Sequence, residues 1–101
     1  MSSIVSERRY GRFMIGRQLL LDNPEGVRWL LSKCLIWKAE YAMDSHAFEY
    51  WALCEAYPSL PMGVAAPVYD VVFEVELLRD GSCRERPVGF QIGDQVVTWA
   101  R

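Results

Sequence analysis

Histidine and cysteine, the residues that proteins most often use to bind metal ions, are scarce in this chain of 101 residues. His46 is the single histidine, and the three cysteines, Cys34, Cys54 and Cys83, lie too far apart to include a CxxC pair. An odd number of widely spaced cysteines fits neither a zinc site nor a disulfide framework. The sequence therefore predicts no metal and no other cofactor, with free thiols in a reducing cytoplasm.

Long apolar runs are also absent. The longest uncharged stretch, 56–69, is too short for a membrane-spanning helix and contains three prolines. Near the N-terminus, Arg17 and Gln18 interrupt the apolar segment 13–21, which therefore lacks the core of a signal peptide. We expect a soluble, cytoplasmic protein without a membrane partner.

Basic side chains are missing from the middle of the chain. Between Ala39 and Leu78 there is no lysine or arginine, and the acidic residues give this stretch a charge of −7. The first 21 residues carry a charge of +3, from one acid and four arginines: Arg8, Arg9, Arg12 and Arg17. Because opposite charges within one small protein attract, we expect the basic segment to lie against the acidic part of the fold.

Weak nucleic-acid binding is an alternative role for the basic segment. The four arginines are interspersed with Tyr10 and Phe13, as in segments that track phosphates while aromatic rings stack on bases. The overall charge of −2 and the acidic middle of the chain oppose such binding. Nucleic acid is therefore a disfavoured partner, whose contacts would come from Arg8, Arg9, Arg12 and Arg17.

The length and the pattern of apolar residues predict a single α+β domain over residues 1–101, with a frayed segment at 1–6. Asp22-Asn23-Pro24-Glu25 is typical of a helix start, and apolar residues at helical spacing follow it. We expect a helix from Pro24 to about Lys33. This one N-terminal helix would pack on a mostly antiparallel sheet of four to six strands.

Strands are indicated most clearly in the C-terminal half. Residues 68–78 alternate between apolar and acidic side chains, and the Asp80-Gly81 pair that follows favours a two-residue hairpin turn. Residues 83–90 are expected to run back antiparallel, with Pro87 at an edge or a bulge. A further turn at Gly93-Asp94 would lead into a short last strand.

Two segments are ambiguous. Residues 8–21 fit an edge strand kinked at its glycines, or a strand followed by a loose turn. Residues 35–57 have a helical composition but also alternate with a period of two, and Asp44-Ser45 fits a tight turn between two strands. For this second segment we favour a β-hairpin over a continuation of the helix.

The run Glu49-Tyr50-x-Ala52, followed by Gly63 and Pro67-x-Tyr69, resembles a pattern found in small uncharacterised bacteriophage and prophage proteins. In that pattern a strand ending in EYxA leads through a glycine-containing loop to PxY and the next strand. The resemblance implies a phage origin and a bacterial host cell, but no activity and no catalytic residue. Cys54 departs from the pattern, which has a small hydroxyl residue at that position.

Two sets of side chains are candidates for a catalytic site, and neither forms a complete set of catalytic groups. His46 lies near Asp44, but in a hairpin Cys54 would sit far along the strand, so no nucleophile meets a base. Glu74 and Glu76 share a strand face at about 7 Å, a spacing that suits an acid-base pair. Exposed acids on a strand are nevertheless ordinary, and we expect a protein without enzymatic activity.

A binding surface remains as the predicted functional feature. The chain has four tryptophans, so some must lie near the surface, where aromatic side chains concentrate the binding energy of interfaces. We expect a phage accessory protein that binds a host protein, with a homodimer also possible; a virion or assembly component is the alternative. The predicted partner-binding residues are Trp51, Tyr57, Leu60, Met62, Glu74 and Glu76.

Overall fold

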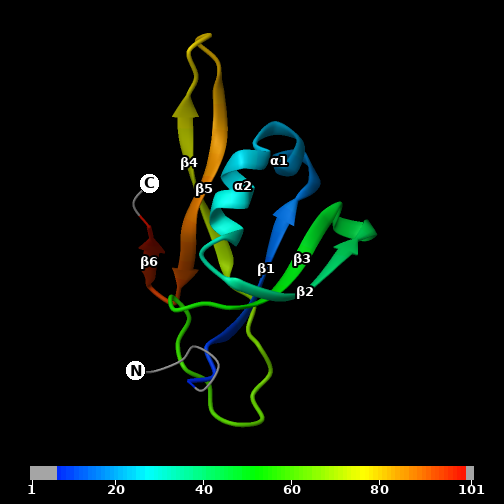
Figure 1. Cartoon of the computed structure of the whole chain (residues 1–101), viewed down its shortest axis with the longest axis vertical. Helices are drawn as coiled ribbons and strands as arrows, with labels where there is room; N and C mark the ends of the chain where they lie inside the picture. The colour runs from blue at the N-terminus through cyan, green and yellow to red at the C-terminus, as the bar shows by residue number, and fades with distance from the viewer. Residues whose placement is uncertain (1–6, 100–101) are drawn as a thin grey trace.

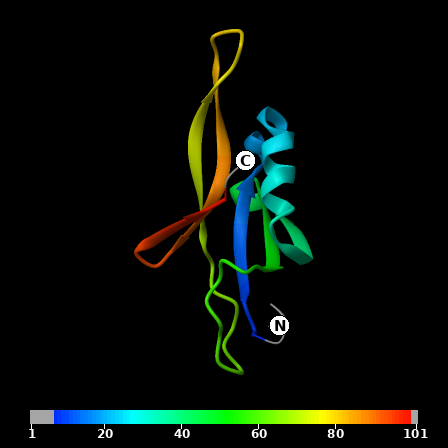
Figure 2. The ribbon, with the colours of Figure 1, turned by 60° about the vertical axis from the view of Figure 1, so that its left-hand side comes forward.

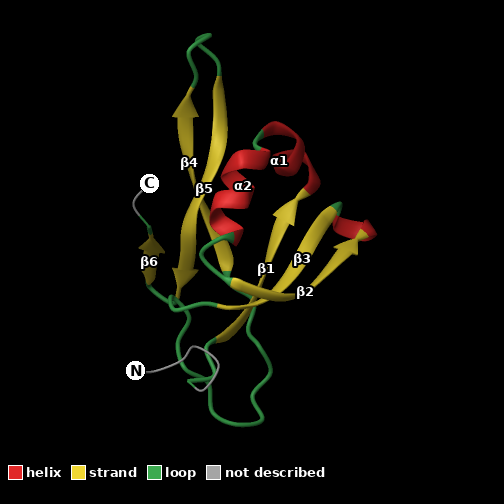
Figure 3. Ribbon diagram, viewed as in Figure 1, coloured by secondary structure: helices red, strands yellow, loops and turns green. Residues whose placement is uncertain are grey.

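The computed structural model describes residues 7–99 and has the α+β architecture that the sequence predicts (Figures 1 and 3). The expected frayed segment 1–6 lies outside the described residues. In chain order the elements are β1 (Tyr10–Gly16), α1 (Arg17–Asp22), α2 (Pro24–Leu31), β2 (Leu35–Ala42), the 3-10 turn η1 (Met43–Ser45), β3 (Ala47–Leu53), β4 (Asp70–Leu77), β5 (Cys83–Ile92) and β6 (Gln95–Thr98).

The strands form two antiparallel sheets of three strands each. Sheet A has the order β1-β3-β2, and sheet B has the order β4-β5-β6. The prediction of one helix on a single sheet of four to six strands is therefore wrong in its arrangement, since the described part of the chain has two sheets and two α-helices. An isolated parallel bridge between Arg12 of β1 and Val68 joins the two sheets.

The bridge between the sheets is short because of the segment that precedes β4. The Arg12 N–H donates to the Pro67 carbonyl and the Tyr69 N–H donates to the Arg12 carbonyl, each at 2.8 Å. Pro67 has no N–H with which to extend the ladder. Strands β1 and β4 diverge beyond this point (Figure 1), so the chain builds two sheets where the alternating pattern suggested one.

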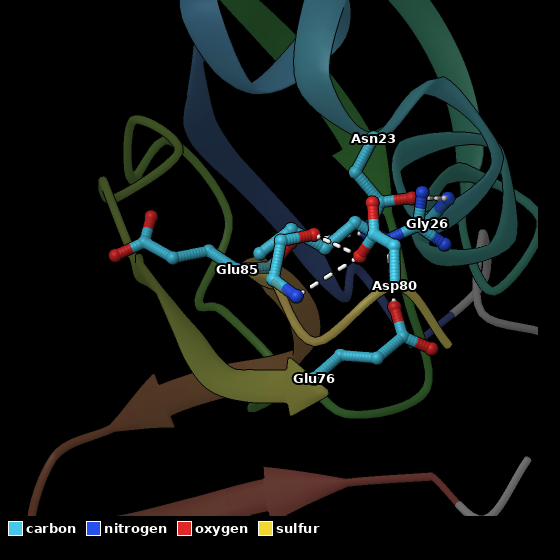
Figure 4. Close-up of polar contacts among 7 residues, drawn as sticks. Asn23, Gly26, Glu76, Asp80 and Glu85 are labelled. Carbon is cyan, nitrogen blue, oxygen red and sulfur yellow. Dashed lines mark hydrogen bonds and ion pairs between the residues drawn. The ribbon is translucent and has the colours of Figure 1, made fainter. Parts of the chain in front are cut away.

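Helix α2 begins where the sequence predicts. The Asn23 side chain accepts a hydrogen bond from the Gly26 N–H at 3.0 Å, and Pro24 occupies the first turn. The Asn23 amide nitrogen also donates to the Glu85 carbonyl of β5 at 3.0 Å (Figure 4). A Cβ at Gly26 would lie 2.6 Å from that nitrogen, so the glycine makes room for the cap. One fully buried side chain thus fixes the helix start against sheet B.

Both ambiguous segments form regular structure. Residues 35–57 contain the predicted hairpin of β2 and β3, in which turn η1 is followed by His46 with a φ of 50°. Residues 8–21 contain β1 followed directly by helix α1, where the sequence indicated only a loose turn. Leu19 is the buried residue of α1, so packing against the core stabilises a helix that has little periodic signal of its own.

Aromatic rings from both sheets meet in the core. The Phe13 ring stacks on Tyr50 within sheet A and meets the edge of Phe90 from β5, with centroid separations of 5.4 and 5.1 Å. Tyr57, from the loop between the sheets, stacks on Tyr69 at 4.6 Å. The buried core cluster comprises Phe13, Ile15, Leu19, Val27, Leu30, Ala52, Cys54, Tyr57 and Phe90.

Strands β4 and β5 extend past the core as a two-stranded arm, residues 74–86 (Figure 1). Both helices lie on one side of it (Figure 2). Phe73, Val75 and Leu77 share the apolar face of β4, as the alternation predicts, yet they are 39, 74 and 73% exposed. The turn lies at Asp80-Gly81, as predicted, and Gly81 has a φ of 88°. It is longer than the predicted two residues, because the Leu78 N–H donates to the Ser82 carbonyl at 2.8 Å and leaves residues 79–81 in the loop.

Candidate functional site

The outer face of sheet A brings basic and aromatic side chains from three strands together. Arg12 of β1, Trp51 of β3 and Lys38 of β2 are neighbours across the ladder. The Lys38 Nζ lies 4.4 Å and the Arg12 Cζ 6.0 Å from the centroid of the Trp51 ring. These cation–π contacts hold the indole between two positive charges.

A bulge in β2 adds a second tryptophan to this face. The pairing of β2 with β3 shifts between Ile36 and Lys38, which leaves Trp37 without a partner in the ladder. Bulges redirect side chains relative to regular alternation. The Trp37 side chain is 54% exposed and lines the same depression as Trp51.

The two tryptophans line a cleft of about 550 Å³ between the outer face of sheet A and the loop that precedes β4. We call this depression the aromatic cleft. Arg12 fixes the loop wall, because its Nε donates to the Ala66 carbonyl at 3.1 Å. The residues that line the aromatic cleft are Arg8, Tyr10, Arg12, Trp37, Trp51, Val64, Ala65 and Ala66.

The charges around the aromatic cleft are mixed, with an excess of positive groups. Arg8 has a buried Nε without a hydrogen-bond partner among the described residues. Arg12 forms an ion pair with Glu49 at 3.3 Å, and Lys38 forms one with Glu40 at 3.1 Å. Ion pairs this exposed are weak, so the cationic groups stay available to a ligand.

The structure disperses the predicted partner-binding residues. Trp51 lies in the aromatic cleft, whereas Met62, 83% exposed, and the half-buried Leu60 lie on the loop between the sheets. Tyr57, which was predicted to contact a partner, is fully buried in the core, so its ring is not exposed to one. The ring fills the space that Gly11 leaves open, since a Cβ at Gly11 would lie 2.5 Å from it.

Glu74 and Glu76 lie on the arm, away from the aromatic cleft, and each faces an arginine of β5. The Arg86 Nη2 donates to Glu74 at 2.9 Å, and the Arg84 Nε donates to Glu76 at 2.8 Å. Each pair is directly opposite in the antiparallel ladder. The arm therefore presents two ion pairs in a row, and the acidic surface expected from β4 alone is neutralised by the strand that returns beside it.

The arginines of the basic segment point to different parts of the molecule, because most of that segment is strand β1. Arg8 and Arg12 line the aromatic cleft. Arg9 is structural, since its Nη1 donates to the Tyr57 carbonyl at 2.7 Å. Arg17 is exposed and follows the far end of β1. Two of the four predicted nucleic-acid contacts are thus brought together.

The structure keeps apart the two residues that the sequence offered as a base and a nucleophile, His46 and Cys54. His46 precedes β3 and Cys54 follows it, so about 26 Å of extended strand separates the two residues. In the same range, no group of three potential metal-ligating side chains is found. None of the helices seen there is both long enough and apolar enough to cross a membrane.

Sequence reasoning missed parts of the aromatic cleft. Lys38 and the loop 64–66 carried no recognisable signal, and Trp37 was only one tryptophan among four. The strand alternation placed Trp37 and Lys38 on opposite faces, and the bulge between Ile36 and Lys38 overrides it. The adjacent Trp37-Lys38 pair beside a cross-strand Trp51 is visible only once the register of β2 on β3 is known.

Comparison of the chain with protein-family models, curated proteins and solved structures gave no match. The resemblance to small phage proteins therefore stays a prediction.

Proposed function

We propose that this chain is a small, non-enzymatic binding protein that engages a partner protein through the aromatic cleft. One observation carries the proposal: Trp37 and Trp51 line a hollowed surface whose walls also hold Arg12. Tryptophan, tyrosine and arginine are the residues that contribute most to the binding energy of protein interfaces.

The cleft is also organised in advance for binding. Trp51 sits on the central strand of sheet A, and the cation–π contacts with Arg12 and Lys38 restrict its rotation. A side chain already held in place loses little conformational entropy when a ligand contacts it. An apolar or aromatic side chain flanked by a carboxylate would match the indole rings and the basic groups beside them.

A bacterial host protein is the proposed class of partner, and the bacterial cytoplasm the proposed location. The resemblance of residues 49–69 to small phage proteins supports a bacterial host protein as the partner. A cytoplasmic location is supported by the free thiols at Cys34, Cys54 and Cys83, which are typical of a reducing compartment.

Site-specific photo-cross-linking tests this proposal. Val64 is replaced with a photoreactive phenylalanine derivative, and the protein is irradiated in bacterial lysate. Val64 is 47% exposed at the wall of the cleft, and Val96 on β6, 53% exposed and outside it, is the matched control position. We expect one specific cross-linked product from position 64 and none from position 96. The product should disappear when Trp37 and Trp51 are both changed to alanine.

A control variant, Val96→Ala, tests whether loss of any exposed apolar side chain has the same effect. Equal cross-linking by wild type and by the Trp37→Ala/Trp51→Ala variant would contradict the proposal. Circular dichroism of the double variant is required to match wild type, because Trp51 also pairs across two strands.

Single-stranded nucleic acid is a second candidate ligand for the same cleft. The Arg8 guanidinium lies 5.6 Å from the Tyr10 ring centroid, so cations and stacking surfaces are interleaved as in proteins that bind single strands. Titration with oligothymidylate, followed by tryptophan fluorescence, tests this. Arg8→Ala/Arg12→Ala should weaken binding and lower the salt slope by about 1.4, while Arg17→Ala serves as the control outside the cleft. Absence of quenching at low salt would exclude this ligand.

A further inference from the structure

Cys34 and Cys54 are opposite each other at the end of the β2–β3 ladder. The antiparallel register pairs Leu35 with Leu53 and Ile36 with Ala52. Extending it by one residue places Cys34, directly before β2, opposite Cys54, directly after β3. Twenty positions separate the two cysteines in the sequence, so only the fold brings them together.

The hydrogen bonds around the two cysteines show which type of cross-strand pair they form. The Cys54 N–H donates to the Arg9 carbonyl on the β1 side at 3.1 Å, and the Cys34 N–H donates to the Leu31 carbonyl at 3.2 Å. Neither N–H is directed across the β2–β3 pair, so this is a non-hydrogen-bonded position. Such pairs have Cα atoms about 4.5 Å apart and closely spaced side chains. Disulfides span Cα separations of about 4.4 to 6.8 Å.

The two thiols differ in access and share a polar environment. Cys54 is 1% exposed, and its Sγ lies 3.5 Å from the Lys33 carbonyl, adjacent to Cys34 in the chain. Cys34 is half-buried and reachable from solvent. A hydrogen bond from the Cys34 thiol lowers the pKa of Cys54, and the same contact, with burial, raises the pKa of Cys34. The half-buried Cys34 thiol therefore lies against a fully buried thiol, Cys54, that is more easily deprotonated.

We propose that Cys34 and Cys54 are a site of reversible covalent modification, which closes to an intramolecular disulfide by exchange with a low-molecular-weight disulfide. The accessible Cys34 sulfur attacks the reagent while its proton passes through the hydrogen-bonded Cys54 thiolate to the reagent sulfur that leaves; a mixed disulfide forms on Cys34 and one reagent thiol is released. The Cys54 thiolate then attacks the Cys34 sulfur, and a second reagent thiol leaves with the proton. Two protein thiols are oxidised and one reagent disulfide is reduced to two thiols.

The disulfide would tie the start of β2 to the end of β3. Strand β2 is the open edge of sheet A and carries Trp37 three positions after Cys34. Closing a loop of about twenty residues removes conformations from the unfolded chain and so stabilises the folded one. Oxidation is therefore expected to fix the edge strand that forms one side of the aromatic cleft.

The experiment uses the full chain with Cys83→Ser, because Cys83 is exposed on the arm and would form mixed disulfides of its own. The folded protein is incubated with oxidised glutathione, then denatured, alkylated and digested. We expect loss of both alkylatable thiols, a linked pair of peptides containing Cys34 and Cys54, and a rise in Tm of about 10 °C or more. Dithiothreitol should restore both thiols and the original Tm.

Two results would overturn the proposal. One is that both thiols stay alkylatable in the folded protein while the same glutathione buffer oxidises them in urea, which would show that the fold keeps them apart. The other is a stable glutathione adduct on Cys34 that Cys54 does not displace. The Cys34→Ser/Cys83→Ser variant is the control and should show no linked peptides and no rise in Tm; the Cys83→Ser result does not depend on how this variant folds.

Discussion

Sheet A and the arm of sheet B are built from similar alternating sequences, but the apolar face is buried in sheet A and exposed in the arm. In sheet A, Phe13 and Ile15 of β1 are fully buried in the core between the two sheets and the helices. In the arm, Val75 and Leu77 of β4 alternate just as regularly and are more than 70% exposed. Alternation determines which residues share a face of a strand. Whether another element covers that face depends on the path of the rest of the chain.

The two regions also differ in how they use charge. On the outer face of sheet A, Arg12 and Lys38 lie over an indole ring and line or border a cleft. On the arm, Arg84 and Arg86 pair one to one with the glutamates opposite them. Arg12 and Lys38 also form ion pairs, with Glu49 and Glu40, but in addition they contact the Trp51 ring beside a cleft. This combination of cations, an indole ring and a cleft is the reason for proposing a binding surface on sheet A.

The comparison is tested most severely by truncating an apolar residue in each region. Phe13→Ala removes a buried ring of sheet A and is expected to lower the free energy of unfolding by about 3–5 kcal/mol. Leu77→Ala on the arm should change it by less than about 0.5 kcal/mol. Urea denaturation followed by tryptophan fluorescence measures both. Equal losses would show that the arm face is covered in solution, for example by a second copy of the chain.

Substitution of Gly11, in strand β1, is expected to lower the free energy of unfolding by less than Phe13→Ala does, and Gly16 of the same strand provides a control. A Cβ at Gly11 would lie 2.5 Å from the Tyr57 ring, whereas a Cβ at Gly16 would meet nothing within 4 Å. Gly11→Ala should destabilise the fold by about 1–3 kcal/mol, because the tightly packed core must shift to admit the methyl group. Gly16→Ala is the matched control and should be close to neutral. A neutral Gly11→Ala would mean that Tyr57 does not occupy this space.

Asn23 tests the attachment of the helices to the base of the arm. Asn23→Ala removes both the cap on Gly26 and the bond to the Glu85 carbonyl, and should cost about 1–2 kcal/mol. Asn23→Asp keeps the acceptor for the cap but loses the donor. If the contact with β5 matters, Asn23→Asp will recover only part of the loss. Hydrogen exchange at the start of α2 would report the cap separately from the global unfolding measured by urea.

The smallest effects should come from the ion pairs of the arm. Glu74→Gln is expected to cost about 0.2–1 kcal/mol, because the Glu74 side chain is 59% exposed. Glu76→Gln should cost slightly more, since Glu76 and Arg84 are each 26% exposed. Both losses should shrink as salt is added. A loss that persists at high salt would point to a packing role for these side chains.

Local patterns in the sequence predicted local structure well. The helix start at Asn23, the hairpin of residues 35–57 and the position of the turn at Asp80-Gly81 all depend on neighbouring residues, and all are confirmed, although the turn is longer than the predicted two residues. The split into two sheets was not predictable in this way. It depends on a bridge between Arg12 and Val68, which lie far apart in the chain.

The candidate site was predicted only in part, for a related reason. Trp51, Arg8 and Arg12 were identified from their residue types, but their convergence with Trp37 required the bulge in β2. Tyr57 was misplaced because its loop is rich in proline and glycine, which usually indicates an exposed segment. No local pattern in the sequence shows that the Tyr57 ring packs into the space beside the distant Gly11.

The same bridge between Arg12 and Val68 has a consequence for the order of folding. The β2–β3, β4–β5 and β5–β6 pairs are hairpins whose strands are joined by short turns, so each closes a small loop. The bridge joins residues more than fifty positions apart, so its formation closes a much longer loop of the chain. Since the entropy of loop closure rises with separation, we infer that the hairpins form first and that the joining of the two sheets limits the folding rate.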